Sequence, residues 1–146
     1  MRIILDTNLY ISAALIPGSF VDRVVRWCLE HGEVYFSQST YLELKTRITR
    51  NKFDQDRYQT LEQRMRFVES ILSFERVLFC DPKEVISVIT EDEPDNRILE
   101  VAVECQAEYI ITGNRRHFKP LHPFRGIAIL EPREFYDQVI MNVRTS

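Results

Sequence analysis

The sequence predicts an α/β protein, a three-layer α/β/α sandwich with a mainly parallel sheet of about five strands. Three observations predict this fold. Five short runs are rich in β-branched or aromatic residues, each run is continuously apolar, and longer segments of helical period separate most of them. Apolar runs that alternate with helices are typical of parallel strands covered on both faces. The five predicted strands are residues 3–5, 34–36, 77–79, 109–111 and 127–130.

Two of the intervening segments carry clear helical signals. A helix over about residues 20–31 should end at Gly32, because glycine favours helix termination. Between residues 54 and 74, apolar side chains recur three and four positions apart, which predicts a helix with one apolar stripe and with Asp54 as its N-cap. The stripe consists of Tyr58, Leu61, Met65, Val68 and Leu72.

Two further helices are expected where acidic residues occur. One opens near Ser39, and the other begins around Pro94 and runs to about Gln106. The apolar run 85–90, which precedes the second of these helices, is too short for its period to decide between strand and helix. The order of the strands in the sheet does not follow from the pattern alone.

Length and composition indicate one ordinary globular domain over residues 1–146. Hydrophobic residues make up 45%, charged residues 28%, and the net charge is −3. These values exclude a disordered chain and a uniformly basic protein that coats nucleic acid. The three cysteines have no metal-site or disulfide spacing, Asp6 interrupts any signal-peptide apolar region, and no charge-free run is long enough to span a bilayer. We therefore expect a soluble, cytoplasmic protein.

Charge is segregated along the chain. Residues 44–66 contain seven basic and three acidic residues, whereas residues 91–108 contain seven acidic residues and one arginine. An acidic cluster beside a basic stretch suits a site that holds metal ions and approaches a polyanion. Two solvated helix faces would explain the same counts equally well.

Polar side chains follow several predicted strands. Residues 6–8 (Asp-Thr-Asn) follow the first strand, Ser37 follows the second, and residues 112–114 (Thr-Gly-Asn) follow the fourth. Ligands of open parallel sheets gather at these carboxyl ends. Two predicted helices add Glu43 and the pair Asp92 and Asp95 near the same edge.

Each acid has an ordinary interpretation when taken alone. Asp6 could cap the following helix, Asp92 and Asp95 could interact with a helix dipole, and Glu43 could be a solvated helix residue. Asn114 could be a simple turn residue. Taken together, they favour a functional site.

Convergence of Asp6, Glu43 and Asp95 would be costly without a cation. Two like charges 4 Å apart repel by roughly 4 kcal/mol at an effective dielectric of 20. Acids cluster in this way only with raised carboxyl pKa values or with a bound cation, and a divalent metal ion is the natural resolution. Since no His or Cys is spaced to join these acids, the donor set consists of oxygens and favours Mg²⁺ or Mn²⁺, one ion or two.

The chain resembles the PIN-domain ribonucleases, and within them the toxin components of bacterial or archaeal toxin–antitoxin pairs. The resemblance extends from Ile3 to about Glu134. Each of its motifs is weak by itself, but their order and spacing together are specific. The motifs are residues 6–8, 37–44, 92–99 and 109–114.

The resemblance implies a PIN-like parallel fold and metal-dependent cleavage of single-stranded or loop RNA. By motif position, it implies that Asp6, Glu43 and Asp95 are the core acids and that Asp92 accompanies Asp95. Asn114 stands where a further Asp is often found and brings no charge, and Asn8 is placed to orient ligands. The resemblance also implies a small antitoxin that occupies the acidic groove, and pairing of the chain as a homodimer.

Several basic residues are candidates to contact the RNA backbone, although each could be a solvated charge. Contacts of this kind give salt-dependent affinity with little sequence choice. Three follow Glu43 and three adjoin the acidic motifs. They are Arg47, Arg50, Lys52, Arg97, Arg115 and Arg116.

Two other functions remain open at this point. An aspartate-nucleophile phosphatase would use Asp-x-Asp after the first strand, but Asn8 stands at the second position, and a phospho-aspartate at Asp6 would be its signature. A non-catalytic PIN-like module that binds RNA or protein is kept open by Asn114, and a metal titration discriminates it. Phosphate-binding glycine motifs are absent, and the three histidines are too scattered to indicate histidine catalysis.

Overall fold

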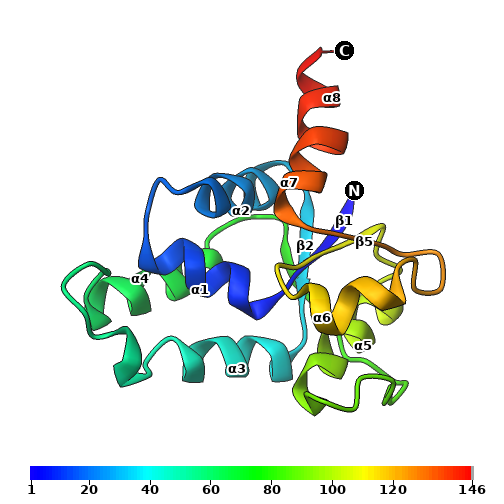
Figure 1. Ribbon diagram of the computed structural model, residues 1–146, viewed down its shortest axis with the longest axis horizontal. Coiled ribbons are helices and arrows are strands. Elements are labelled where there is room, and N and C mark those ends of the chain that lie inside the picture. The colour runs from blue at the N-terminus through cyan, green and yellow to red at the C-terminus, as the bar shows by residue number, and fades with distance from the viewer. Residues whose placement is uncertain (146) are drawn as a thin grey trace.

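Five parallel strands form the central sheet of the computed structural model, which describes residues 1–145 (Figure 1). Their order in the sheet is β3-β2-β1-β4-β5. All four neighbouring pairs are parallel, as predicted. The strands are β1 (Arg2–Leu5), β2 (Glu33–Phe36), β3 (Val77–Phe79), β4 (Tyr109–Ile111) and β5 (Ala128–Leu130).

Helices connect the strands and cover both faces of the sheet (Figure 1). Between β1 and β3 the chain forms α1 (Thr7–Leu15), α2 (Phe20–His31), α3 (Gln38–Arg47) and α4 (Leu61–Ile71). Beyond β3 it forms α5 (Asn96–Glu104), α6 (Arg115–Phe118), α7 (Pro132–Phe135) and α8 (Met141–Thr145), with a π-helical segment at Tyr136–Ile140. Short 3-10 turns lie at Asn51–Phe53, Glu93–Asp95 and Lys119–Leu121.

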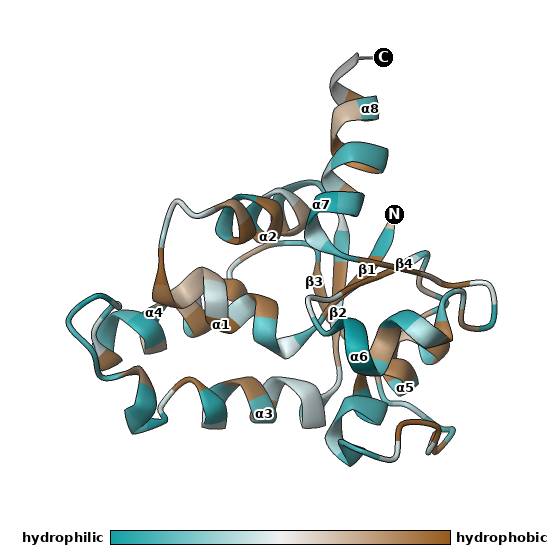
Figure 2. Ribbon diagram, in the orientation of Figure 1, coloured by the Kyte–Doolittle hydropathy of each residue, from teal (hydrophilic) through white to brown (hydrophobic). Residues whose placement is uncertain are grey.

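Alternate residues of β1 belong to separate hydrophobic cores. Ile3 and Leu5 pack with the side chains of α1, α2 and α4, whereas Ile4 packs with those of α5. Because successive side chains of a strand point to opposite faces, two cores mean helices on both sides of the sheet. The three-layer prediction is confirmed. The strands are largely hydrophobic, as Figure 2 shows, apart from the charged first residues of β1 and β2.

The order of the strands creates a crevice at the carboxyl end of β1. From β1 the chain continues to β2 and β3 on one side of the sheet, and it returns to β4 and β5 on the other side. Loops and helices therefore diverge above β1 and β4, which is where open α/β sheets bind ligands. No helix among the described residues is long and apolar enough to cross a membrane.

Gly32 ends α2, as predicted, and the reason is steric. Its φ of −109° is open to any residue, but a Cβ at this position would lie 2.7 Å from Ile3 Cδ1 and 3.1 Å from the carbonyl oxygen of Cys28. Glycine therefore lets the end of α2 pass close to β1. This close packing holds the first strand against the layer of α1 and α2.

The helix expected between residues 54 and 74 is shorter than predicted, and Asp54 does not cap it. Helix α4 begins at Leu61, where Thr60 and Gln63 form a reciprocal capping box. Such a box satisfies two backbone amides at the start of the helix, those of Thr60 and Gln63, and overrides a weaker signal upstream. Asp54 instead ends the 3-10 turn at Asn51–Phe53 and pairs with Arg64 at 3.0 Å.

The apolar stripe predicted for this helix is also wrong in part. Val68 is buried as predicted, but Leu61, Met65 and Leu72 are exposed. Arg64 and Ile71 are buried in their place. The buried face of α4 is rotated relative to the predicted stripe because it includes Arg64, whose guanidinium forms hydrogen bonds in the interior. The guanidinium donates to the carbonyl oxygens of Ile48, Phe53 and Gln59 at 3.0–3.2 Å, and these carbonyls belong to the segment joining α3 to α4.

The run 85–90 is neither strand nor helix. Ile86 and Ile89 are buried against α5, and their backbone groups bond to side chains of that helix. The backbone amide of Ile86 donates to Glu100 at 2.9 Å, and that of Ile89 donates to Asn96 at 2.9 Å. Side chains thus replace the backbone ladder that a strand would provide. Helix α5 ends at Glu104, two residues before the predicted end.

Candidate metal centre

Asp6 lies at the end of β1 and is only 2% exposed. It occupies the N-cap position of α1, but its side chain makes no capping hydrogen bond. Its carboxylate instead accepts from the Thr112 hydroxyl at 2.8 Å, across from the end of β4. The helix-cap interpretation of Asp6 is therefore wrong, and its side chain points into the crevice between the two strands.

Burial raises the pKa of Asp6 to about 6, in spite of the Thr112 hydrogen bond. The charges of Asp95 and Glu43 raise this pKa further, and the Arg47 guanidinium lowers it. Hydrogen bonds link two of these acids: the Thr112 hydroxyl donates to Asp6 and accepts from the backbone amide of Asn114, whose side chain donates to Asp95. The ends of β1 and β4 and the turn before α5 therefore share one neighbourhood.

Glu43 reaches this neighbourhood from α3. The helix begins immediately after β2 because Ser37 and Thr40 form a capping box at its first turn. Burial raises the pKa of Glu43, while Arg47, one turn later, lowers it through a 3.3 Å hydrogen bond. Arg47 also donates to the side-chain oxygen of Asn8, so one guanidinium joins α3 to α1.

Asp95 closes the 3-10 turn before α5 and is 9% exposed. Burial raises its pKa, as does the neighbouring carboxylate of Asp92, which is itself exposed. Asn114, after β4, donates its side-chain amide to Asp95 Oδ2 at 3.3 Å. Asn114 also accepts from the backbone amide of His117 at 3.2 Å, so it caps α6.

His117 lies within this cluster, and the sequence interpretation missed it. Its Nδ1 lies 2.8 Å from Asp95 Oδ2, and its Nε2 lies 3.3 Å from a carboxylate oxygen of Glu91. The two carboxylates raise the pKa of the imidazole. His117 stands three residues after Asn114, one helical turn away. That spacing could have found it, since residues three apart share a helix face.

The expectation that no histidine is placed to join these acids is wrong. Asp92, Asp95 and His117 each offer one ligand atom, and these three atoms lie within 4.8 Å of one another. Asp6 and Glu43 are not members of this group; Asp6 is linked to Asp95 through the Thr112 hydroxyl and Asn114. His117 Nδ1 is already in hydrogen-bond contact with Asp95 Oδ2 at 2.8 Å, and a group of this composition could hold a divalent ion.

The six basic candidates lie in different surroundings. Only Arg47 contacts the cluster through Glu43 and Asn8. Arg50 and Lys52 are exposed beyond α3. The other three are paired with acids: Arg97 with Glu93 and Glu100, Arg115 with Glu131, and Arg116 with Glu91.

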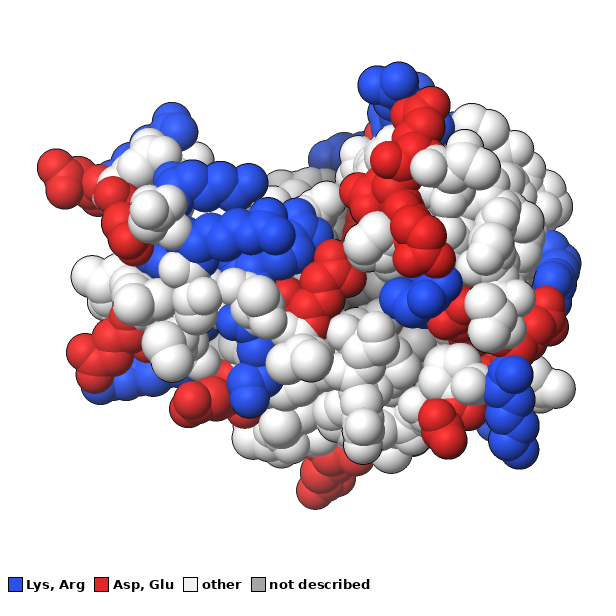
Figure 3. Space-filling view, turned by 90° about the horizontal axis from the view of Figure 1, so that it is seen from below, with Lys and Arg blue, Asp and Glu red and all other residues white. Residues whose placement is uncertain are grey.

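Figure 3 shows basic and acidic side chains on two sides of a hollow. The basic group gathers over α3 and the segment that follows it, which corresponds to residues 44–66 of the sequence. The acidic group gathers over the segment that leads to α5. The charge segregation along the chain is therefore also a segregation in space.

The parallel fold and the acidic crevice place this chain in one class, that of α/β proteins whose site lies at the ends of the central strands. The sequence model of the PIN-domain family matches residues 2–116. The chain therefore belongs to the PIN-domain family.

Solved structures are similar in fold along nearly the whole chain. VapBC2 from Rickettsia felis, solved with a DNA fragment from its promoter, has a TM-score of 0.63 at 15% identity, covering 90% of this chain and 98% of the other. VapBC-1 from nontypeable Haemophilus influenzae has a TM-score of 0.56 at 23% identity, covering 91% and 99%. No curated protein sequence matches the chain.

Proposed function

We propose that this chain is a metal-dependent ribonuclease that hydrolyses phosphodiester bonds of RNA, and that it is the toxin of a toxin–antitoxin pair. One observation carries the catalytic part. Asp6 is buried at the end of β1 and is linked to Asp95 through Thr112 and Asn114. Arg47 joins Glu43 of α3 to Asn8, two residues after Asp6. Buried carboxylates with raised pKa values are typical of functional sites.

Asp6 and Asp95, with Glu43, would hold Mg²⁺ or Mn²⁺, and Asp92 would lie at the rim. A bound ion of this kind lowers the pKa of a water molecule and neutralises charge that develops on the phosphoryl group. Asn114 carries no charge and already donates to Asp95, which favours one ion over two.

The remaining side chains have supporting roles in this proposal. Thr112 orients Asp6, and His117 orients Asp95, each through one hydrogen bond of 2.8 Å. Asn8 and Glu43 are joined through Arg47, whose charge also offsets the repulsion between the acids. Partners of this kind hold first ligands in a productive geometry.

Arg50 and Lys52 are the strongest of the proposed contacts to the RNA backbone. Both are exposed beyond Glu43, and no carboxylate of residues 1–145 lies within ion-pair distance of either. Arg97, Arg115 and Arg116 are already paired with acids and would have to exchange those partners. We expect the first two to determine most of the salt dependence of binding.

The similarity to VapBC complexes supports the partner part of the proposal. Those structures are toxin–antitoxin complexes, and each covers nearly all of this chain. An antitoxin segment would fit the crevice best if it carried a cation into the acidic cluster. Toxicity on expression, relieved by co-expression of the neighbouring reading frame, tests this part. Light scattering of the purified chain tests the expected homodimer.

Cleavage of a fluorescently labelled single-stranded RNA tests the activity. Chelation should stop it, and added Mg²⁺ or Mn²⁺ should restore it. Asp6→Asn and Asp95→Asn should each reduce turnover at least a hundredfold, because each removes a ligand charge. Asp56→Asn, a change at an exposed aspartate of the segment before α4, is the matched control and should retain wild-type turnover.

A metal titration separates this proposal from a non-catalytic module. Calorimetry with Mn²⁺ should give saturable binding that Asp6→Asn weakens. Absence of binding in the wild-type chain, together with undiminished affinity for RNA, would favour the binding module. Turnover of Asp6→Asn at the wild-type rate would remove the catalytic assignment.

A further inference from the structure

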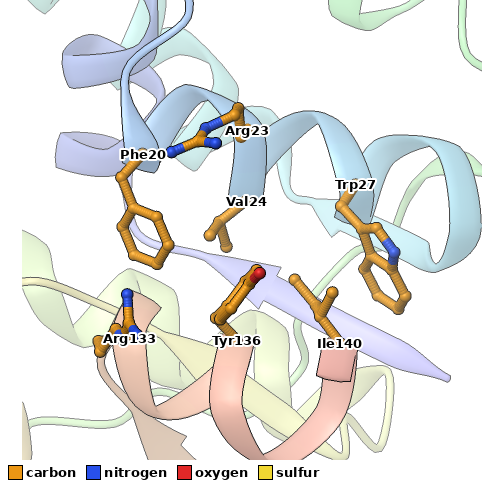
Figure 4. Close-up of a pocket in the computed structure, with 7 residues that line it drawn as sticks. All are labelled: Phe20, Arg23, Val24, Trp27, Arg133, Tyr136 and Ile140. Carbon is orange, nitrogen blue, oxygen red and sulfur yellow. The ribbon is translucent and has the colours of Figure 1, made fainter. Parts of the chain in front are cut away.

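A second concave site lies between α2 and the helical segment that follows β5 (Figure 4). It is a cavity of about 190 Å³ and does not include any of the acids described above. Figure 4 shows Phe20 and Arg133 at one end and Trp27 and Ile140 at the other, with Tyr136 between them. We call this site the aromatic pocket.

The walls of the aromatic pocket combine rings with guanidinium groups. The Arg133 guanidinium lies 5.4 Å from the ring centroids of both Phe20 and Tyr136, and that of Arg23 lies 5.9 Å from the Phe20 centroid. Phe20 and Tyr136 meet edge to face, with centroids 5.4 Å apart. Such walls offer a flat ligand a ring or a guanidinium plane to stack on.

The two arginines leave positive charge available. Both are exposed, and Arg133 pairs with Asp137 at 3.4 Å on the surface. Among the residues that the structure describes, no carboxylate lies within ion-pair distance of Arg23. An exposed pair such as Arg133 with Asp137 is weak and exchanges readily for another anion. The aromatic pocket therefore suits a ligand with one negative charge beside one planar ring.

A groove joins the aromatic pocket to the acidic crevice. It is a shallow space of about 620 Å³, with Asn8, Gly113 and Asn114 at one end and Phe20 and Arg133 at the other. The last two also line the aromatic pocket, so the two spaces share a wall. Away from that wall, two other lining residues of the groove contact the acidic site: Asn8 contacts Arg47, and Asn114 contacts Asp95. An extended chain can therefore run from one site to the other.

We infer that the aromatic pocket binds one nucleotide of a single-stranded RNA whose scissile phosphate lies at the acidic crevice. The base stacks among Phe20, Trp27 and Tyr136, and its phosphate is bound by Arg23 and Arg133. This inference rests on the proposed function. A nucleic-acid strand matches the walls better than a protein segment does, because every nucleotide presents a phosphate and a flat ring together.

The chain contains a single tryptophan, and it lies in the aromatic pocket. Fluorescence of Trp27 therefore reports directly on occupancy. The probe is an oligoadenylate of about ten nucleotides, added to the Asp6→Asn chain so that it is not cleaved. We expect saturable quenching, with an affinity that falls as salt rises. An abasic oligomer of the same length should bind more weakly and quench little.

Three variants and one control locate the binding. Arg23→Gln and Arg133→Gln each remove one exposed cation, and Tyr136→Leu keeps an apolar side chain but removes a ring. Each variant should lower the affinity for the oligoadenylate about fivefold or more, as expected for loss of one stacked, phosphate-bound nucleotide. Arg66→Gln, at an exposed arginine of α4, changes the net charge equally and should have no effect.

Cleavage assays connect the aromatic pocket to the crevice. In the otherwise wild-type chain, the pocket variants should raise KM for the long oligomer and leave cleavage of a dinucleotide unchanged, since a dinucleotide does not reach the pocket. Equal effects on both substrates, or no quenching of Trp27 by the oligoadenylate, would overturn the inference. Quenching by a peptide rich in Asp and Phe but not by RNA would overturn it as well, in favour of a protein partner.

Failure of the proposed function gives a different result. If the wild-type chain cleaves no RNA but oligoadenylate still quenches Trp27 and the pocket variants abolish the quenching, the nucleotide pocket stands and the nuclease assignment falls. If cleavage is metal-dependent but the pocket variants behave like Arg66→Gln, the nuclease assignment stands and the pocket inference falls.

Discussion

His117 Nδ1 lies 2.8 Å from Oδ2 of Asp95, so an imidazole fixes the orientation of one of the proposed ligand carboxylates. The contact requires a proton on Nδ1, because a carboxylate oxygen can only accept. Glu91 lies 3.3 Å from the other ring nitrogen. The ring therefore bridges two acids that precede α5 and holds them against α6.

Replacement of His117 should separate an orienting role from a simple structural one. His117→Ala removes the donor and should weaken Mn²⁺ binding about ten- to a hundredfold, the usual effect of losing a partner of a metal ligand. His117→Asn keeps a donor near the position of Nδ1 and should recover most of that affinity. Calorimetry near pH 7.5 measures both variants.

The opposite pattern would identify a different role. Suppose that His117→Asn binds Mn²⁺ as weakly as His117→Ala does, while both variants keep wild-type affinity for Mg²⁺. The imidazole is then itself a ligand. Unchanged Mn²⁺ affinity in both variants would show that the hydrogen bond to Asp95 has no part in metal binding.

Asp6→Asn should stabilise the metal-free protein at neutral pH. Burial raises the folded-state pKa of Asp6 from 3.8 to about 6, so the folded chain binds this proton more tightly than the unfolded chain does. The contribution of Asp6 to the free energy of unfolding is therefore most favourable below pH 3.8. It declines as the pH rises between about 4 and 6, and it is least favourable above pH 6.

The expected gain for Asp6→Asn at pH 7.5 is on the order of 2 kcal/mol, or about 5 °C in Tm, and it should vanish near pH 4. Asparagine keeps an oxygen to accept from Thr112. Thermal unfolding with chelator at the two pH values measures the difference, with Asp56→Asn as control. A variant that is less stable than wild type at pH 7.5 would contradict the burial of a charged Asp6.

Arg64 should be among the most important residues for stability outside the crevice. Its side chain is fully buried and binds three backbone carbonyls in addition to Asp54. Arg64→Met fills a similar volume but leaves those carbonyls without donors, which should cost about 3 kcal/mol or more. Urea unfolding measures the loss. Arg66→Met, two residues further along α4 and exposed, should change stability by less than about 0.5 kcal/mol.

The strands of this protein were predictable because each is a short apolar run, although only β1, β4 and β5 are mostly buried and β3, at the edge of the sheet, is largely exposed. The end of α2 was predictable from Gly32. The acids at the strand ends were found because parallel strands end at one edge. Helix α4 was misplaced because the burial of Arg64 depends on carbonyls from a segment 5 to 16 residues earlier. His117 was missed because its partner, Asp95, lies 22 residues before it.

The irregular run 85–90 shows a further limit of pattern reasoning. Apolar periodicity describes which residues are buried, and Ile86 and Ile89 are indeed buried. Apolar periodicity does not predict which groups form hydrogen bonds with the backbone amides of these residues. In this chain the side chains of α5 do so, and only the tertiary structure brings them within reach.

Asn96 holds the segment that carries Asp92. Its side chain is fully buried, accepts from the backbone amide of Ile89 at 2.9 Å, and donates to the carbonyl oxygens of Ile89 and Glu93 at 2.8 and 3.0 Å. Three hydrogen bonds from one amide therefore anchor the acidic segment to the first turn of α5.

Asn96→Ala should release this segment before the rest of the fold. Ile89 would lose its acceptor, so its amide should exchange with deuterium at least tenfold faster. The exchange rates of the β1 and β4 amides should change only in proportion to the global stability. The buried groups left unpaired should cost about 2 kcal/mol or more. Mn²⁺ affinity should fall as well, because Asp92 would no longer be held near Asp95 and His117.

Asn51→Ala, at an exposed asparagine in the turn after α3, is the control and should leave exchange at Ile89 unchanged. If Asn96→Ala accelerates exchange equally at Ile89 and at the strands, the segment unfolds only with the whole protein, and its acids are positioned by the entire fold rather than by this one side chain.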